Sequence, residues 1–439
     1  MKFLIKPFKS HGGVKVPHKK NTKDEKSIIM PPPKEVIIPM LQHIGAQCKP
    51  IVSVGEKVYV GQVIGDSEAF VSTPIHSSVS GVVKGIEKLR LPTSEAVDSI
   101  LIESDGLMQK YSGIKPPKVR NAQELVEATR ESGLVGLGGA GFPAHVKLKI
   151  PKGCKIDTLI VNAAECEPYI TSDNRAILEE HNSLIDGINK IKNLLNIKKV
   201  IIAIESNKPI AIKLLEENLK NEDDIAVLKL KSRYPQGAEK ILIKVCTNRV
   251  VPLGRLPSDV GCIVMNVGSV VFLSNYLKTG MPLVSKRVTI DGSAIKEPKN
   301  LIVPIGSRIS DVIKFAGGYK SIPGKLIMGG PMMGIALMDD SLPVLKQNNA
   351  ILAFDVEDAK IPKGGPCIRC GKCVEGCPMK LMPTLLEKQS KLKNVDELID
   401  LNVMTCMECG CCSYNCPAGR NLVQSIKLGK LIVKNASKR

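Results

Sequence analysis

Two cysteine quartets towards the C-terminal end constrain this chain more than any other feature. The first is Cys367-x2-Cys370-x2-Cys373-x3-Cys377, with Pro378 directly after it, and the same spacing returns 39 residues later as Cys406, Cys409, Cys412, Cys416 and Pro417. This spacing lets three thiolates of one tight loop reach three irons of a [4Fe–4S] cubane, while the fourth cysteine ligates the other cluster in two-cluster proteins. The sequence therefore predicts a pair of [4Fe–4S] clusters.

The crossed arrangement defines two ligand sets. One cluster is expected on Cys367, Cys370, Cys373 and Cys416, and the other on Cys406, Cys409, Cys412 and Cys377. A zinc site would need two pairs of cysteines rather than two quartets. A disulfide-stapled module is also disfavoured, because nine of the 14 cysteines fall between residues 367 and 416 of an otherwise ordinary chain. Cys411 lies between ligands, and we interpret it as a small buried residue.

The charge and hydropathy of the chain limit its partners. The formal net charge is +19, which would suit nucleic acid, an anionic membrane surface or an acidic protein. Nucleic acid is disfavoured because only 3% of the residues are aromatic and could stack on bases. The first eight residues are interrupted by Lys2 and Lys6, so no secretory signal is expected. The longest apolar run, 260–273, falls short of a spanning helix.

Residues 1–118 are predicted to form a basic, irregular segment followed by a small all-β module. The segment contains His11-Gly12-Gly13 and many lysines. From residue 35, valine-rich pieces alternate with glycines, as in 52–65 and 79–83, and short strands between turns are typical of all-β folds. The pattern resembles the barrel-sandwich of biotinyl and lipoyl domains. Those domains attach a cofactor to a hairpin lysine, which the corresponding stretch 71–76 lacks, so the resemblance implies the fold alone.

The rest of the chain divides into three units, which makes the fold class multidomain α/β and α+β. Residues 119–278 have strands expected at 158–162, 199–205, 224–230 and 262–266, with helices at 122–132, 177–195 and 207–219. This alternation indicates a mainly parallel sheet covered on both faces. Residues 279–360 suggest a β-grasp-like (SLBB) module with one helix at 309–316. Residues 361–439 are predicted to be a helical ferredoxin-type domain with two clusters.

A glycine-rich loop, 136–141, formally matches G-x-G-x-x-G. In a Rossmann unit this motif follows a strand directly, whereas here it follows the helical pattern of 122–132. An ordinary dinucleotide fingerprint is therefore not expected. A backbone this rich in glycine can still approach a flat or phosphorylated ligand closely.

Four motifs in one order resemble the NADH-oxidising flavoprotein subunit of respiratory complex I. They are the glycine loop with Phe142, Pro143 and Lys147; Asn162-Ala-Ala-Glu165-Cys166-Glu167-Pro168; Tyr234-x-x-Gly237-Ala238-Glu239; and Asn266-Val267. The resemblance implies FMN held by Gly136, Gly138, Gly139, Gly141, Phe142, Asn162, Glu165 and Asn266. It also implies NADH near Glu167, Tyr234, Gly237 and Glu239, with Lys147 close to phosphate. Leu137, Ala164, Cys166, Ala238 and Met265 depart from the family's pattern.

The order of the units, with His11-Gly12-Gly13 near the start, resembles the RnfC subunits of Rnf complexes, the membrane-bound ferredoxin:NAD⁺ oxidoreductases. The resemblance implies hydride exchange with NAD(H) at FMN and relay of single electrons through the two clusters. It also implies a peripheral place on the cytoplasmic face of the membrane, integral and iron–sulfur partner subunits, and electrons from ferredoxin that drive ion translocation. Two alternatives stay open: a cobalamin reductase of the propanediol-utilisation type, and a non-enzymatic electron-transfer adaptor.

Overall fold

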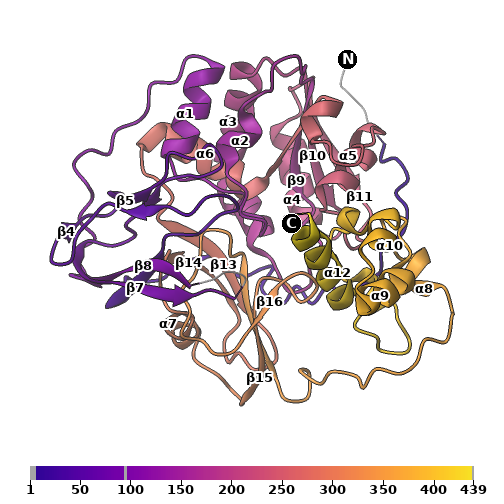
Figure 1. Ribbon diagram of the computed structural model, residues 1–439. Coiled ribbons are helices and arrows are strands. Elements are labelled where there is room, and N and C mark those ends of the chain that lie inside the picture. The colour runs from indigo at the N-terminus through magenta and orange to yellow at the C-terminus, as the bar shows by residue number, and fades with distance from the viewer. Residues whose placement is uncertain (1–5, 93–95, 438–439) are drawn as a thin grey trace.

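The computed structural model describes residues 6–92 and 96–437, and Figure 1 shows four packed units along the chain. The first five of the eight residues considered for a secretory signal lie outside these ranges. Two units are built on β-sheets, one is an α/β unit, and the last, yellow in Figure 1, is helical. Across the described residues, none of the helices combines the length and the apolar character that crossing a lipid bilayer requires.

The first unit packs two small antiparallel sheets around a shared core. Their orders are β2-β8-β7-β4 and β3-β5-β6. The bounds are β2 Glu35–Pro39, β3 Lys49–Pro50, β4 Lys57–Val58, β5 Val63–Asp66, β6 Ile75–His76, β7 Gly81–Arg90 and β8 Ala96–Ser104. Residues 71–76, which correspond to the cofactor-bearing hairpin of biotinyl and lipoyl domains, do not protrude into solvent. Ser72 and Thr73 are fully buried, and the Thr73 hydroxyl donates to the carbonyl of Arg130 at 2.9 Å. This hairpin is docked on the α/β unit.

The α/β unit contains a four-stranded parallel sheet of order β11-β10-β9-β12. The strands are β9 Thr158–Ala163, β10 Lys199–Glu205, β11 Ile225–Leu230 and β12 Cys262–Asn266. The helices are α1 Ala122–Glu131, α2 Ala144–Leu148, α3 Ser172–Leu194, α4 Pro209–Asn218, α5 Glu239–Thr247 and α6 Val267–Thr279, with the 3-10 helix η1 Pro257–Val260. Helices α3, α4 and α6 share one core with the sheet and α5 another. The predicted parallel sheet with two covered faces is thus present.

The third unit is a six-stranded mixed sheet of order β1-β14-β13-β17-β15-β16, packed with one helix. The bounds are β1 Ile28–Ile29, β13 Ser285–Asp291, β14 Lys299–Pro304, β15 Pro323–Met328, β16 Ile335–Leu337, β17 Ala350–Asp355 and α7 Ile309–Phe315. Its edge strand β1 comes from the N-terminal segment and pairs in parallel with β14.

The C-terminal unit repeats its backbone as well as its sequence. Its elements are α8 Lys372–Glu375, α9 Pro383–Leu392, α10 Val395–Asp400, η2 Val403–Thr405, α11 Cys411–Tyr414 and α12 Leu422–Ala436. Each cysteine loop turns through a left-handed glycine directly before a short helix, Gly371 at φ 76° and Gly410 at φ 77°. Arg369 and Glu408 also share positive φ values of 56° and 60°. The two loops therefore adopt one conformation, as expected if each binds a cluster.

The N-terminal segment extends across the α/β unit, the third unit and the cysteine-rich unit. The amide of Gly13 donates to the carbonyl of Gly376 in the cysteine-rich unit, and Val14 pairs with Tyr234 of the α/β unit. The amide of Tyr169 donates to the carbonyl of His18 at 3.0 Å. We refer to residues 8–30 as the N-terminal strap.

Candidate functional site

A cavity of about 1210 Å³ opens where the four units meet, and all thirteen predicted FMN and NADH residues line it. Asn162 lies near the end of strand β9 and Asn266 ends the parallel neighbour β12, so both lie at the carboxyl edge of the sheet, where α/β folds bind ligands. The volume exceeds the roughly 300–1,000 Å³ of common ligand pockets. It therefore has room for a flavin and a nicotinamide together.

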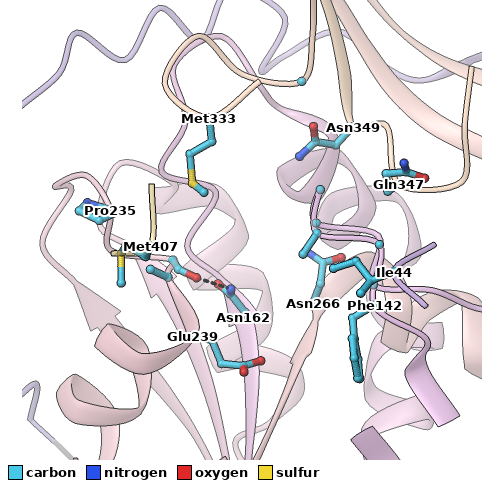
Figure 2. A pocket seen from close by; sticks show the side chains of 18 of the residues that line it. Ile44, Phe142, Asn162, Pro235, Glu239, Asn266, Met333, Gln347, Asn349 and Met407 are labelled. Atoms are coloured by element: carbon cyan, nitrogen blue, oxygen red, sulfur yellow. Dashed lines mark hydrogen bonds between the residues drawn. The ribbon is translucent and has the colours of Figure 1, made fainter. Parts of the chain in front are cut away.

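The glycine loop forms one wall of this cavity (Figure 2, right). Its ends are closed by hydrogen bonds from the Gly136 amide to the Phe142 carbonyl at 2.8 Å and from the Gly141 amide to the Gly136 carbonyl at 3.3 Å. Gly139 has φ +111°, and a Cβ at Gly138 would lie 3.0 Å from Nδ2 of Asn266. The loop follows helix α1 rather than a strand. As expected, it is no Rossmann fingerprint, but its bare backbone fits the close approach of a flat ring.

The two asparagines are already engaged in holding the cavity loops. Nδ2 of Asn162 donates to the carbonyl of Gly237 at 2.8 Å, the bond drawn in Figure 2. Nδ2 of Asn266 donates to Asp173 at 2.7 Å, and its Oδ1 accepts from the Ser269 amide at 3.4 Å, which caps helix α6. Asn162 thus joins the end of β9 to the loop of Gly237, and Asn266 joins the end of β12 to the first turn of helix α3.

The acidic loop carries two carboxyl groups whose pKa values are raised. Burial raises the pKa of Glu165 to about 7, and one of its oxygens, Oε2, is buried without a hydrogen-bond partner while the other accepts from the Asp173 amide at 2.6 Å. Burial also raises the pKa of Glu167 to about 7. The Glu167 carboxylate accepts from the amides of Met332 and Met333 at 3.0 and 2.9 Å. It thereby fastens the third unit over the cavity.

Three other predicted residues have partners within the protein. The ammonium of Lys147 pairs with the carboxylate of Glu239 and donates to the carbonyl of Val264 at 3.3 Å. Tyr234 is only 1% exposed, and its hydroxyl donates to the carbonyl of Cys409 at 2.8 Å. The Tyr234 hydroxyl is therefore bound to a cysteine loop. The predicted contact of Lys147 with a phosphate group stays a prediction.

The cysteines approach one another across the two quartets, in keeping with the crossed arrangement. Burial, with smaller contributions from the neighbouring thiolates of Cys406, Cys409 and Cys377, raises the pKa of Cys412 to about 12. These four cysteines, together with Cys411, line one small cavity of about 20 Å³. Burial likewise raises the pKa of Cys373, with Cys416 and Cys367 as its charged cysteine neighbours. Both groups are soft thiolate donors, which fit a cubane.

Cys411 and the exposed cysteines differ in environment. Cys411 is fully buried, and its thiol faces the Tyr234 carbonyl at 3.9 Å, in keeping with a packing role. Cys367 and Cys370 are exposed. Among the described residues, no three acidic, histidine or cysteine side chains converge as for a single metal ion. A cubane instead spreads its four ligands over four irons.

Four family models each match a segment of one of the four units. Residues 8–107 match the RnfC barrel-sandwich hybrid domain, 129–275 the Nuo51 FMN-binding domain, 287–336 the SLBB domain and 366–420 the 4Fe-4S dicluster domain. A subunit of the proton-translocating ferredoxin:NAD(+) oxidoreductase complex of Clostridium ljungdahlii is 43% identical over 87% of this chain and 84% of that protein. A subunit of the Na(+)-translocating ferredoxin:NAD(+) oxidoreductase complex of Acetobacterium woodii is 41% identical over 95% and 96%. The chain belongs to the RnfC family.

Membership of the RnfC family confirms the predicted fold class, the assignment as part of an oxidoreductase and the two cofactor types, FMN and [4Fe–4S]. The cobalamin reductase and adaptor alternatives are not favoured by these relatives. A third relative, from the ion-translocating oxidoreductase complex of Rhodobacter capsulatus, is 37% identical over 97% of this chain and 83% of that protein. A solved chain of an NAD+-reducing [NiFe]-hydrogenase aligns with a TM-score of 0.49 at 17% identity, over 71% of this chain and 63% of that chain.

The five departures from the flavoprotein motifs fall into two groups. Leu137 and Ala164 are 5% and 0% exposed and belong to hydrophobic cores, so these two changes concern packing. Cys166, Ala238 and Met265 line the cavity. The Cys166 sulfur accepts a hydrogen bond from the Gly237 amide at 3.4 Å. The Cys166 thiol thus connects the acidic loop to the loop of Gly237.

Several residues that line the cavity were not predicted from the sequence. Gln347 and Asn349 of the third unit lie opposite Met333 and Met407 in Figure 2, and Ile44 reaches in from the barrel-sandwich. Oε1 of Gln347 is buried without a hydrogen-bond partner. These residues come from three different units, and no local motif marks them. They reach the flavoprotein motifs only because units that are far apart in the sequence pack together.

Proposed function

We propose that this chain is the NAD(H)-reacting subunit of an ion-translocating ferredoxin:NAD⁺ oxidoreductase complex. The observation that carries the proposal is a shared wall: Met379 and Met407 line both the large cavity and the small cavity between the cysteines, which Cys377, Cys406, Cys409, Cys411 and Cys412 line. A site for a two-electron carrier therefore adjoins a site for a one-electron carrier. FMN, when bound, supplies the exchange between hydride and single electrons.

The residues of the chain bind and orient the reactants in this proposal. The glycine loop would hold the flat ring. Asn162 fixes the loop of Gly237, and Asn266 fixes the first turn of helix α3 through Asp173. Glu165 and Glu167 have pKa values near 7 because of burial, so each can hold or release a proton close to neutral pH. The ion pair of Lys147 and Glu239 lies in the same wall.

The partner subunits would meet the chain at the other cysteine set. Cys367 and Cys370 are exposed, and so are Lys363, Arg369 and Lys372 around them. A basic rim favours an acidic redox partner, because opposite charges steer the encounter. We place the chain on the cytoplasmic face of the membrane, held by integral and iron–sulfur subunits that deliver electrons from ferredoxin. Its net charge of +19 also favours contact with anionic lipids, which high salt would weaken.

The test uses the full chain, purified without oxygen and reconstituted with iron, sulfide and FMN. From the two quartets and the flavin cavity we expect about two [4Fe–4S] clusters and about one flavin per chain. We also expect FMN-dependent reduction of an artificial acceptor by NADH. Gly138→Leu is the matched variant with a blocked flavin site, because its side chain fills the wall formed by the glycine loop while the cysteines stay intact. Full iron and flavin loading without any NADH-driven reduction would refute the proposal and favour the adaptor.

A further inference from the structure

Lys20 of the N-terminal strap is inserted behind the acidic loop of the flavin cavity. Its ammonium donates to the carbonyls of Glu165 and Glu167, both at 2.9 Å, and to the carbonyl of Ile170. A lysine ammonium has three donors, so all three are used on one loop. Its Nζ also lies 3.9 Å from the Glu165 carboxylate, and the side chain is 12% exposed.

The loop that Lys20 holds has an unusual backbone. Glu165 has φ +48° and Tyr169 has φ +68°, a region that residues other than glycine seldom adopt and that persists only when the surroundings enforce it. The carbonyls of Glu165, Glu167 and Ile170 converge on one ammonium in this conformation. The strap adds two further bonds at the end of the loop, from the Tyr169 amide to the His18 carbonyl at 3.0 Å and between the hydroxyls of Thr22 and Thr171 at 2.6 Å.

The same loop presents its side chains to the cavity. Glu165, Glu167 and Ile170 line it, whereas Lys20 does not. Lys208 supports the loop from the opposite end, with its Nζ 2.7 Å from the Ala164 carbonyl and 4.0 Å from the Glu165 carboxylate. Lys20 thus acts on the cavity through the loop, and it brings a positive charge close to the buried carboxyl group.

We propose that Lys20 is a positioning residue of the flavin cavity, which fixes Glu165 and Glu167 at the cavity wall by binding three carbonyls of the loop that carries them. The identity of the ligand rests on the proposed function. The conformational order of the loop does not depend on that function, because it can be measured in the protein without flavin. A lysine of the N-terminal strap therefore has a specific role in a site whose first motif begins more than a hundred residues later in the sequence.

The experiment compares Lys20→Met and Lys20→Gln with Lys15→Met, an exposed lysine of the same strap, in the full chain with reconstituted clusters. Hydrogen exchange of the amides of residues 162–171 is measured without flavin, and FMN affinity by fluorescence titration. For Lys20→Met we expect faster exchange and an FMN dissociation constant raised on the order of tenfold or more, because small displacements of a binding group have large effects. The midpoint potential of bound flavin should become more negative as the cation is lost, and the affinity and exchange of Lys20→Gln should lie between those of Lys20→Met and the wild type.

Each outcome decides the inference. It is overturned if exchange of residues 162–171 and FMN affinity in Lys20→Met both match Lys15→Met. Faster exchange with unchanged FMN affinity also overturns it, because the loop order would then not matter to the cavity. If Lys20→Met fails to load its clusters, Lys20→Gln is judged by the same criteria. A wild-type chain that does not bind FMN removes the proposed function, while the exchange data still report whether Lys20 holds the loop.

Discussion

The hydroxyl of Tyr234 offers a sharp test of how the flavin cavity is joined to the cysteine loops. It donates to the carbonyl of Cys409 at 2.8 Å inside a buried cluster that also includes Val14 and Cys411. Tyr234→Phe removes this donor and leaves the ring in place, so the change isolates one hydrogen bond. We expect a local loosening of the loop that carries Cys406, Cys409 and Cys412.

The size of the effect follows from burial. A buried carbonyl that loses its partner costs about 1–3 kcal/mol. Because about 1.4 kcal/mol is a factor of ten, opening of the Cys409 loop should become roughly 5- to 150-fold more frequent. The shape of the ring is unchanged, so no cavity contributes to the loss.

The assay is release of iron to a chelator from the anaerobic, reduced protein. Iron bound by Cys377, Cys406, Cys409 and Cys412 should be released faster in Tyr234→Phe, while the remaining half is released at the wild-type rate. Tyr111→Phe is the control, because Tyr111 is 42% exposed. If iron release is unchanged and the KM for NADH rises tenfold instead, Tyr234 acts on the nicotinamide, as its motif alone suggests, and its assignment to the cysteine loop is refuted.

Three further outcomes are expected. Gly138→Leu should lower FMN affinity at least about tenfold in a fluorescence titration, because even its Cβ would lie 3.0 Å from Nδ2 of Asn266; undiminished binding would place FMN elsewhere. Burial raises the pKa of Glu167 from 4.5 to about 7. Between pH 4.5 and 7, Glu167 therefore keeps its proton in the folded chain but loses it in the unfolded chain. The free energy of unfolding should therefore fall as pH rises from 4.5 to 7, and Glu167→Gln should flatten that slope in urea titrations at pH 5 and 8. Cys416→Ser should lose up to half of the iron, whereas Cys411→Ser should keep all of it; the reverse result would make Cys411 a ligand.

The sequence predicted the regular elements well where the pattern was strong. Strands β10 and β12 match the expected 199–205 and 262–266 in full, because both are short, largely apolar runs that contain β-branched residues. Helix α3 was expected from residue 177 but begins at Ser172. Its first turn, Ser172-Asp173-Asn174, is polar and carries no apolar period, so hydrophobic spacing alone could not reveal it.

The course of the N-terminal strap could not be predicted from the sequence. A lysine-rich stretch is usually solvated, and nothing local distinguishes Lys20, whose side chain is only 12% exposed, from the exposed Lys15. The partners of Lys20 lie about 145 residues away. Motifs located the site residues of the α/β unit because these lie in short, recognisable stretches, namely the glycine loop after helix α1 and three stretches at or after the ends of strands. They did not reveal Gln347 and Asn349, whose approach depends on how the units pack.

Buried lysines explain why the cavity needs the whole chain. Lys346 of the third unit donates to the carbonyls of Pro74 and Gly133 at 2.7 and 2.8 Å, and burial lowers its pKa to about 7. Lys286 donates to the Leu137 carbonyl of the glycine loop at 3.0 Å. A buried ammonium is costly unless its donors are satisfied, and these two donate to carbonyls of other units. Lys286 thus supports the glycine loop, and Lys20 the acidic loop, from outside the four flavoprotein motifs. Lys346 joins the barrel-sandwich and the α/β unit to the third unit. The α/β unit alone would carry the motifs without these supports.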